Sequence, residues 1–147
     1  MDEYTTQLVK ESWDLVEPIA PRAAELFYAN LFALDPSLKP LFTHDMAVQG
    51  EKLMKMIGVA VSLLPQPQLL LPALQTLGRR HADYGVRDEH YDTVGTALLS
   101  TLQQGIGVAF TPEVREAWID VYGVLSRTMK EAAPRHRLMT GEHAALP

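Results

Sequence analysis

The sequence predicts an all-α protein, and two patterns support this. Apolar residues recur at the three- and four-residue spacing of helices in nearly every segment, and prolines and glycines stand between these segments. The chain has 147 residues, of which 47% are apolar and 21% are charged, a size and composition that suit one domain with one core. We therefore expect one compact helical domain.

The first two helices are delimited by proline. The first ends at the Glu17-Pro18 step, because a proline ring disfavours the α conformation of the residue before it. A second helix begins at Pro21, where a missing amide hydrogen costs nothing. Asp35-Pro36 then combines a cap with a first helical residue, and it predicts a short helical corner towards Phe42. The apolar faces of the first two helices consist of Val9, Trp13 and Val16, and of Ala24, Phe27, Tyr28 and Leu31.

Two longer helices follow. The first covers about residues 46–64, with Glu51, Lys52 and Lys55 turned away from its apolar stripe. The second follows Pro65 and Pro67 and ends near Gly85, a suitable left-handed C-terminal cap. The two apolar stripes consist of Gln49, Leu53, Met56, Ile57, Ala60 and Leu64, and of Leu70, Leu74, Leu77 and His81.

Two further helices complete the predicted domain. Asp88 caps the first, which ends at Gly105 and Gly107, and Thr111-Pro112 opens the second. Pro134 should end the last helix, so we expect the domain to span 1–134 and residues 135–147 to form a disordered polar tail. Their apolar faces consist of Tyr91, Val94, Leu98 and Leu102, and of Val114, Trp118, Val121, Leu125 and Met129.

Composition and charge argue against several functions. With 18 acidic and 13 basic residues the formal charge is -5, so no basic surface is available for nucleic acid or anionic lipid. The absence of cysteine excludes disulfides, cysteine-ligated zinc and iron–sulfur clusters. The chain has no apolar run of about 18 residues and no secretion-signal pattern at its N-terminus. We expect a soluble, cytoplasmic protein with neither nucleic acid nor membrane as a partner.

Three polar residues interrupt apolar faces: Tyr28, Gln49 and His81. Burying such a group costs about 1–3 kcal/mol unless something inside satisfies it, so these residues are the candidates for function. Each also has an ordinary interpretation. Tyr28 suits a core aromatic with its hydroxyl at the surface, Gln49 a helix-start amide that reaches solvent, and His81 a partly exposed or core histidine.

The other histidines are weaker candidates. His44 remains an outside candidate for a second ligand, whereas His90 at a helix start and His136 and His143 in the tail should be solvated. The sequence contains no HExxH motif, no histidine pair at i, i+4 and no inward carboxylate pair for a metal site built from protein ligands alone. A single axial histidine suffices for haem, because the porphyrin supplies four equatorial nitrogens.

Five motifs then occur in order. They are LFYANLF at 26–32, Asp35-Pro36 followed by Pro40-Leu41-Phe42, LGRRHADYGV at 77–86, HYDTVG at 90–95, and Ala117-Trp118 followed by VYGV at 121–124. Over about residues 5–132 the sequence resembles a globin, specifically the single-domain bacterial haemoglobins related to the haem domain of flavohaemoglobins. The resemblance implies a globin fold of six to eight helices packed around haem b.

The resemblance assigns roles by position. His81 becomes the proximal iron ligand, Phe42 packs on the haem face, and Tyr28 and Gln49 form the distal pair that holds bound O₂. The chain length after Phe42 varies in this family, which leaves Met46 or Lys52 as alternatives to Gln49, although the apolar stripe favours Gln49. The remaining contacts with the cofactor are Leu53 as the distal wall, together with Leu77, Arg80, Val86, Tyr91, Val94, Leu98 and Met129.

The likeness is incomplete on the proximal side. Flavohaemoglobins place a tyrosine and a glutamate beside the proximal histidine, which strengthens it as an electron donor. Tyr91 matches the tyrosine, but the glutamate position falls on Ala133, and Glu131 lies about 200° away around a helix. His81 has the alternative of donating to a backbone carbonyl. At the rim of the pocket, the cations Lys52, Arg79 and Arg80 either contact the haem propionates or form a solvated face.

Four functions follow in order of expectation. The first is reversible binding of O₂, and of CO and NO, at a five-coordinate haem iron for storage, delivery or scavenging. The second is nitric oxide dioxygenation with a separate reductase, because the chain has no room for flavin and nicotinamide domains. A gas sensor is third. A haem-free helical module is the last, and the polar residues on apolar faces argue against it.

Overall fold

The computed structural model describes residues 2–43 and 45–140, with side chains through residue 133. This part of the chain contains six α-helices, three short 3-10 helices and no strand, which confirms the predicted all-α class. The α-helices are α1 (Glu3–Val16), α2 (Ala20–Leu34), α3 (Met46–Leu63), α4 (Pro67–Asp83), α5 (Asp88–Ile106) and α6 (Pro112–Thr140). The 3-10 helices are η1 (Glu17–Ile19), η2 (Pro36–Leu41) and η3 (Gly107–Ala109).

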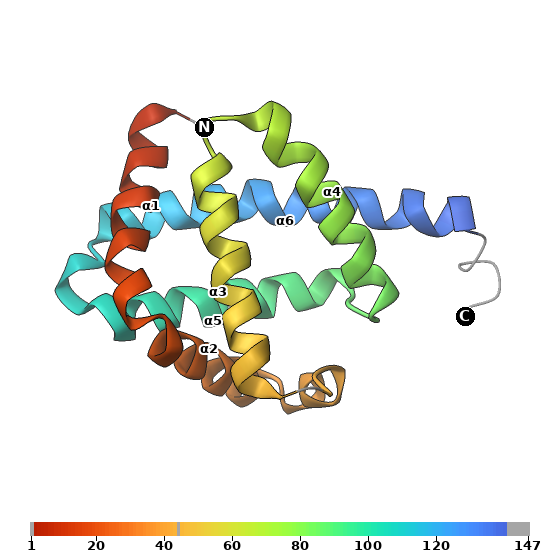
Figure 1. Ribbon diagram of the computed structural model, residues 1–147, viewed down its shortest axis with the longest axis horizontal. Helices are drawn as coiled ribbons and strands as arrows, with labels where there is room; N and C mark the ends of the chain where they lie inside the picture. The colour runs from red at the N-terminus through yellow and green to blue at the C-terminus, as the bar shows by residue number, and fades with distance from the viewer. Residues whose placement is uncertain (1, 44, 141–147) are drawn as a thin grey trace.

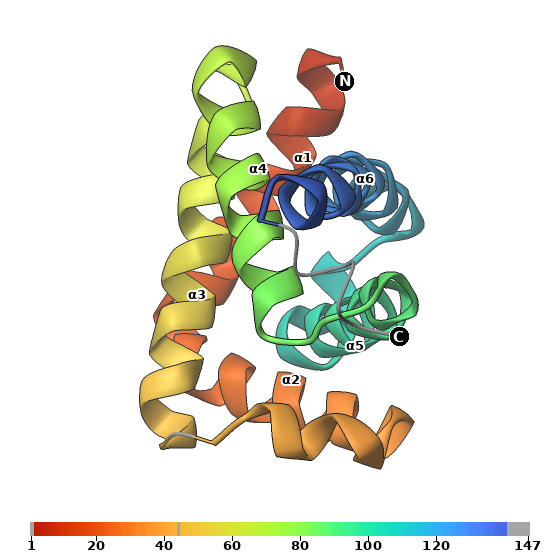
Figure 2. The ribbon, with the colours of Figure 1, turned by 90° about the vertical axis from the view of Figure 1, so that its right-hand side faces the viewer.

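The helices cross one another in layers. In Figure 1, α5 and α6 run across the molecule behind α3 and α4. Figure 2 shows α3 and α4 along one side, α5 and α6 on the other, and α2 below them. The helices α3 and α4 therefore form one layer, α5 and α6 form the layer behind it, and α2 lies below both.

Local sequence explains most helix ends. The side chain of Asp45 caps α3 by accepting hydrogen bonds from the backbone amides of Ala47 and Val48 at 2.8 and 3.3 Å. Asp35 caps η2 in the same way, through the Ser37 amide at 3.1 Å. Beyond α4, Gly85 has a φ of 92°, the left-handed conformation that glycine adopts without strain. The predicted corner before Phe42 and the predicted end of α4 are both confirmed.

Three local predictions are wrong. The last helix does not end at Pro134, because α6 continues to Thr140, so part of the predicted tail is helical and residues 141–147 lie outside the described chain. The N-cap of α5 is Arg87 and not Asp88. His90 is buried instead of solvated. Its Nδ1 accepts a hydrogen bond from the Arg87 amide at 2.9 Å, and this bond closes the first turn of α5.

The core holds the site's helices by close contacts. Trp118 of α6 donates a hydrogen bond from Nε1 to the Ser12 hydroxyl of α1 at 2.8 Å, in a buried position. On the other side, α4 crosses α6 so closely that a Cβ at Gly78 would lie 2.7 Å from the Met129 Cα. The first contact joins α6 to α1, and the second fixes α4, which carries His81, against α6.

None of the described helices combines the length and the apolar character that a membrane crossing requires.

Candidate functional site

His81 lies in the last turn of α4 and is half-buried. Its Nδ1 is 2.9 Å from the carbonyl oxygen of Leu77, one helical turn earlier. A carbonyl can only accept a hydrogen bond, so Nδ1 carries the proton and Nε2 has a free lone pair. Within the described residues, Nε2 has no hydrogen-bond partner. The expected alternative for this histidine, donation to a backbone carbonyl, is therefore confirmed.

The surroundings keep His81 neutral. Burial lowers the pKa of its imidazole below the ordinary value, and the hydrogen bond to Leu77 opposes this with a smaller effect. Neutral imidazole with a free Nε2 is the form that binds a metal ion. The imidazole is thus in the protonation state that can bind a metal ion, and its role as the proximal ligand stays a prediction.

Tyr91 of α5 packs against His81. The two rings are stacked with centroids 6.4 Å apart and an interplanar angle of 25°. Behind Tyr91, the hydroxyl of Tyr122 donates to the Tyr91 carbonyl oxygen at 2.6 Å. A side chain at Gly95 would collide with the Tyr122 ring, since a Cβ there would lie 2.7 Å from Cε2. Gly95, one turn after Tyr91, thus leaves space for the Tyr122 ring, whose hydroxyl binds the α5 backbone at Tyr91.

Tyr28 lies on α2 in an aromatic cluster. Its ring contacts Phe27 edge-on at 5.1 Å, Phe32 in a stacked arrangement at 5.9 Å and Phe42 edge-on at 5.3 Å between centroids. Edge-to-face and offset contacts of this kind hold aromatic rings in defined orientations. Phe42, which follows η2, is half-buried and packs against the same core.

The structure brings Gln49 of α3 to Tyr28. Burial raises the pKa of the Tyr28 hydroxyl, and a side-chain hydrogen bond with Gln49 lowers it by a smaller amount. Of the two alternatives, Met46 and Lys52 are both exposed, whereas Gln49 is half-buried. Gln49 therefore lies near Tyr28, whose hydroxyl is neutral and able to donate, and the role of the two residues as a distal pair stays a prediction.

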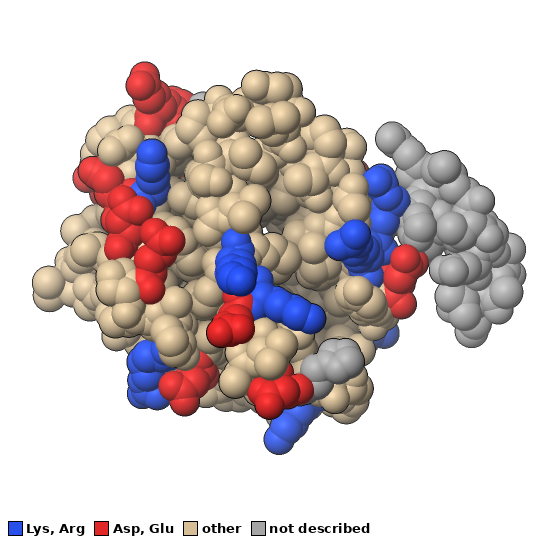
Figure 3. Space-filling view, in the orientation of Figure 1, with Lys and Arg blue, Asp and Glu red and all other residues tan. Residues whose placement is uncertain are grey.

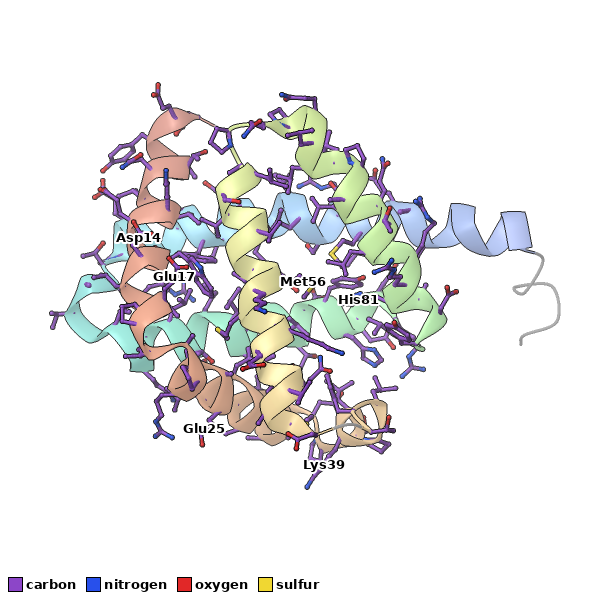
Figure 4. The ribbon with its side chains drawn as sticks, in the orientation of Figure 1. Asp14, Glu17, Glu25, Lys39, Met56 and His81 are labelled. Carbon is purple, nitrogen blue, oxygen red and sulfur yellow. The ribbon has the colours of Figure 1, made fainter. Side chains whose placement is uncertain are left out.

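Several apolar side chains of α3, α4 and the neighbouring segments have intermediate burial. The buried residues of α3 are Gly50, Met54 and Val61, which face the core, while the predicted stripe is mostly half-buried. In Figure 4 the side chains of Met56, from α3, and His81, from α4, lie towards the space between the two helices. The half-buried apolar residues that pack on the core here are Phe42, Leu53, Ile57, Leu77, Val86 and Val94.

Cations lie at the edge of this space. The space-filling view shows basic side chains over α3 and over α4, with a hollow in the surface between them (Figure 3). Lys52 and Arg80 are exposed, and Arg79 is half-buried with its Nη2 donating to the Thr76 hydroxyl at 3.2 Å. The predicted contact of these cations with propionates stays a prediction.

The remaining predicted contacts divide between site and core. Leu98 and Met129 are buried in the core cluster, and Met129 is also the residue on which α4 crosses α6. His44 and His143 lie outside the described residues, as does the side chain of His136. The sequence analysis missed the contact of Tyr122 with the site. The one local feature of the sequence that indicates this contact is Gly95, which lies where the Tyr122 ring needs space.

The arrangement fits a haem group. One neutral histidine offers a free Nε2, aromatic and aliphatic side chains that are only half covered border it, and cations stand at the solvent edge. Within the described residues, no group of three or more histidine, cysteine or acidic side chains offers a metal site built from protein ligands alone. A porphyrin supplies the four nitrogens that such a site lacks.

Comparisons with known proteins agree with this class of protein. The Globin family model matches residues 25–129. Flavohemoproteins of Rhodopirellula baltica and Chromobacterium violaceum are each 30% identical, over 86% and 88% of this chain but only 32% and 33% of their own length. The chain thus spans about a third of the curated relatives that it matches.

Solved structures share the fold. An engineered carbene transferase from Rhodothermus marinus, whose name includes nitric oxide dioxygenase, superposes with a TM-score of 0.86 at 22% identity, covering 96% of this chain and 99% of that one. A bacterial globin from Campylobacter jejuni superposes with a TM-score of 0.79 at 20% identity, covering 91% and 97%. The chain belongs to the globin family, and this family implies a haem cofactor.

Proposed function

We propose that this protein binds haem b through His81 and binds O₂ reversibly, with CO and NO as further ligands, for storage, delivery or scavenging. The observation that carries the proposal is the proximity of Gln49 to the buried Tyr28, whose ring packs among other aromatic rings. Burying two hydrogen-bonding groups there is costly unless they have a ligand or each other to satisfy them.

Haem, when bound, would supply a ferrous iron that takes up a diatomic gas. His81 would hold the group through Nε2, while Leu77 fixes the orientation of the imidazole through the bond to Nδ1. The Tyr28 hydroxyl and the Gln49 amide are donors for a ligand that gains negative charge. Each such bond contributes roughly 0.5–3 kcal/mol, and about 1.4 kcal/mol changes an equilibrium tenfold. Because CO gains less charge, the pair favours O₂.

Replacing Tyr28 with phenylalanine tests the pair. We expect wild-type protein to show a Soret band that shifts on reduction and on exposure to CO. Tyr28→Phe should release O₂ about tenfold faster or more, because it loses one donor to the bound ligand. Release of CO should change much less. Stopped-flow displacement of O₂ by CO measures the rate.

Tyr84→Phe is the matched control. Tyr84 is 68% exposed, so this substitution removes the same chemical group from the surface of the protein. Its O₂ dissociation rate should equal that of the wild type. Equal rates for Tyr28→Phe and the wild type would exclude the tyrosine from ligand binding. If wild-type protein supplied with haem shows no specific Soret band, the proposed function itself is wrong.

Nitric oxide dioxygenation is the second candidate, and the name of one structural neighbour, which includes nitric oxide dioxygenase, favours it. The reaction consumes NO, O₂ and one electron to give nitrate, so turnover needs an electron donor. With NADH and a generic flavin reductase, we expect a storage protein to consume about one equivalent of NO and stop. Sustained consumption that rises with the reductase concentration, beyond that of the reductase alone, would instead identify an enzyme.

A further inference from the structure

A lysine of α6 lies over the ring that stacks on His81. The Nζ of Lys130 is 5.8 Å from the centroid of the Tyr91 ring, within the range of a cation–π contact. Tyr91 in turn stacks on His81 at 6.4 Å between centroids. We call these three groups, His81, Tyr91 and Lys130, the proximal stack. It joins α4, α5 and α6.

The proximal stack has a positive charge at its end. Burial and the nearby charge of Asp88 raise the pKa of Tyr91 to about 12, so its phenol is neutral at physiological pH. Lys130 has a side chain that is 30% exposed, and its Nζ is 3.9 Å from Asp92 Oδ1. The Asp92 side chain is 86% exposed, so solvent screens that carboxylate and it offsets the lysine charge only in part.

The stack differs from the arrangement that the family resemblance implies. A carboxylate beside the proximal histidine increases electron donation to iron. Here Ala133 has no carboxylate to offer, and Glu131 is exposed. Among the described residues, the His81 ring has a backbone carbonyl as its only hydrogen-bond acceptor. Among the described residues, Lys130 is therefore the cation that lies over the ring stacked on His81.

We propose that Lys130 tunes the haem site electrostatically: its ammonium group, held over the Tyr91 ring behind His81, favours the ferrous over the ferric state. This inference rests on the proposed binding of haem by His81. Ferric haem has one more positive charge than ferrous haem, so a cation behind the ligand opposes oxidation. A ferrous bias serves a protein that binds O₂, because the ferric form does not bind it.

The midpoint potential of the haem tests this role. In Lys130→Gln, spectroelectrochemical titration should give a lower midpoint potential, which corresponds to about a threefold smaller ratio of ferrous to ferric protein at a fixed applied potential. Lys130→Glu should shift the potential further in the same direction, and Asp92→Asn should shift it in the opposite direction. Lys130→Arg should retain the wild-type value, since it keeps the charge.

Arg127→Gln is the matched control, because it removes one positive charge from an exposed position one turn earlier on α6. Its midpoint potential should stay at the wild-type value. Equal potentials for the wild type, Lys130→Gln and Lys130→Glu, with haem bound, would overturn the role of Lys130 and leave the proposed function intact. Loss of the Soret band from the wild type would overturn both. The inference would also be contradicted if the haem midpoint potential of the variants correlated with their unfolding temperature and not with the charge at the substituted position.

Discussion

We expect His81→Gly to bind haem at least about a hundredfold more weakly than the wild type, and imidazole at millimolar concentration to restore the binding. The physical reason is the isolation of this ligand. His81 has the only free imidazole nitrogen found in the described part of the site, and its Nδ1 proton is held by Leu77. Glycine leaves a space the size of the ring, with the Leu77 carbonyl still available to orient an added imidazole.

Absorption spectra during haem titration, with and without imidazole, measure this effect. His90→Ala is the control, because His90 is a buried histidine whose bond caps α5. That variant should lose stability and keep the Soret band of a histidine-ligated haem. A His81→Gly spectrum equal to that of the wild type without imidazole would show that another residue binds the iron.

We also expect a large loss of stability when a side chain is added at Gly78, where α4 crosses α6. A Cβ at this position would lie 2.7 Å from Cα and 2.9 Å from the carbonyl carbon of Met129. Because the obstructing atoms are backbone, no side-chain rotation relieves the contact and the helices have to separate. We expect Gly78→Ala to lower the free energy of unfolding by about 1–3 kcal/mol, and also to weaken haem binding, since His81 is three residues away.

Gly123→Ala on α6 provides the comparison. A Cβ there meets no atom within 4 Å, and the position is inside the helix. Alanine is the better helix former by about 1 kcal/mol, so this variant should match or exceed the wild-type stability. Urea denaturation followed by circular dichroism measures both variants. Equal stability of Gly78→Ala and Gly123→Ala would show that the α4–α6 crossing tolerates a side chain.

Local spacing predicted the helices and most of their ends, because a proline, a cap or a left-handed glycine acts within one or two turns of its own position. Pro134 is the exception. A proline removes one hydrogen bond and disfavours the preceding helical turn, yet α6 continues to Thr140. The same reasoning failed for His90, whose ring serves as a capping acceptor because the chain turns back on it at Arg87.

The candidate site was predictable where one helix face carried the signal. His81, Gln49 and Tyr28 each interrupt an apolar stripe, and spacing of three and four residues places such interruptions on the inner face without knowledge of the fold. Spacing left open whether Gln49 or a neighbour meets Tyr28. Only the approach of α3 to α2 settles that, since a Cβ at Gly50 would lie 2.8 Å from the Ala24 Cβ.

The helical class and the three polar residues on apolar faces could thus be predicted from the sequence alone, which also shows that position 133 has no carboxylate. The tertiary structure decided which of these groups meet: Tyr28 with Gln49, His81 with Tyr91, and Lys130 with Tyr91. The reason is geometric. A residue's place on its own helix follows from neighbours within a few positions, whereas contact between helices depends on crossing positions set by small residues such as Gly50, Gly78 and Gly95, far from one another in the chain.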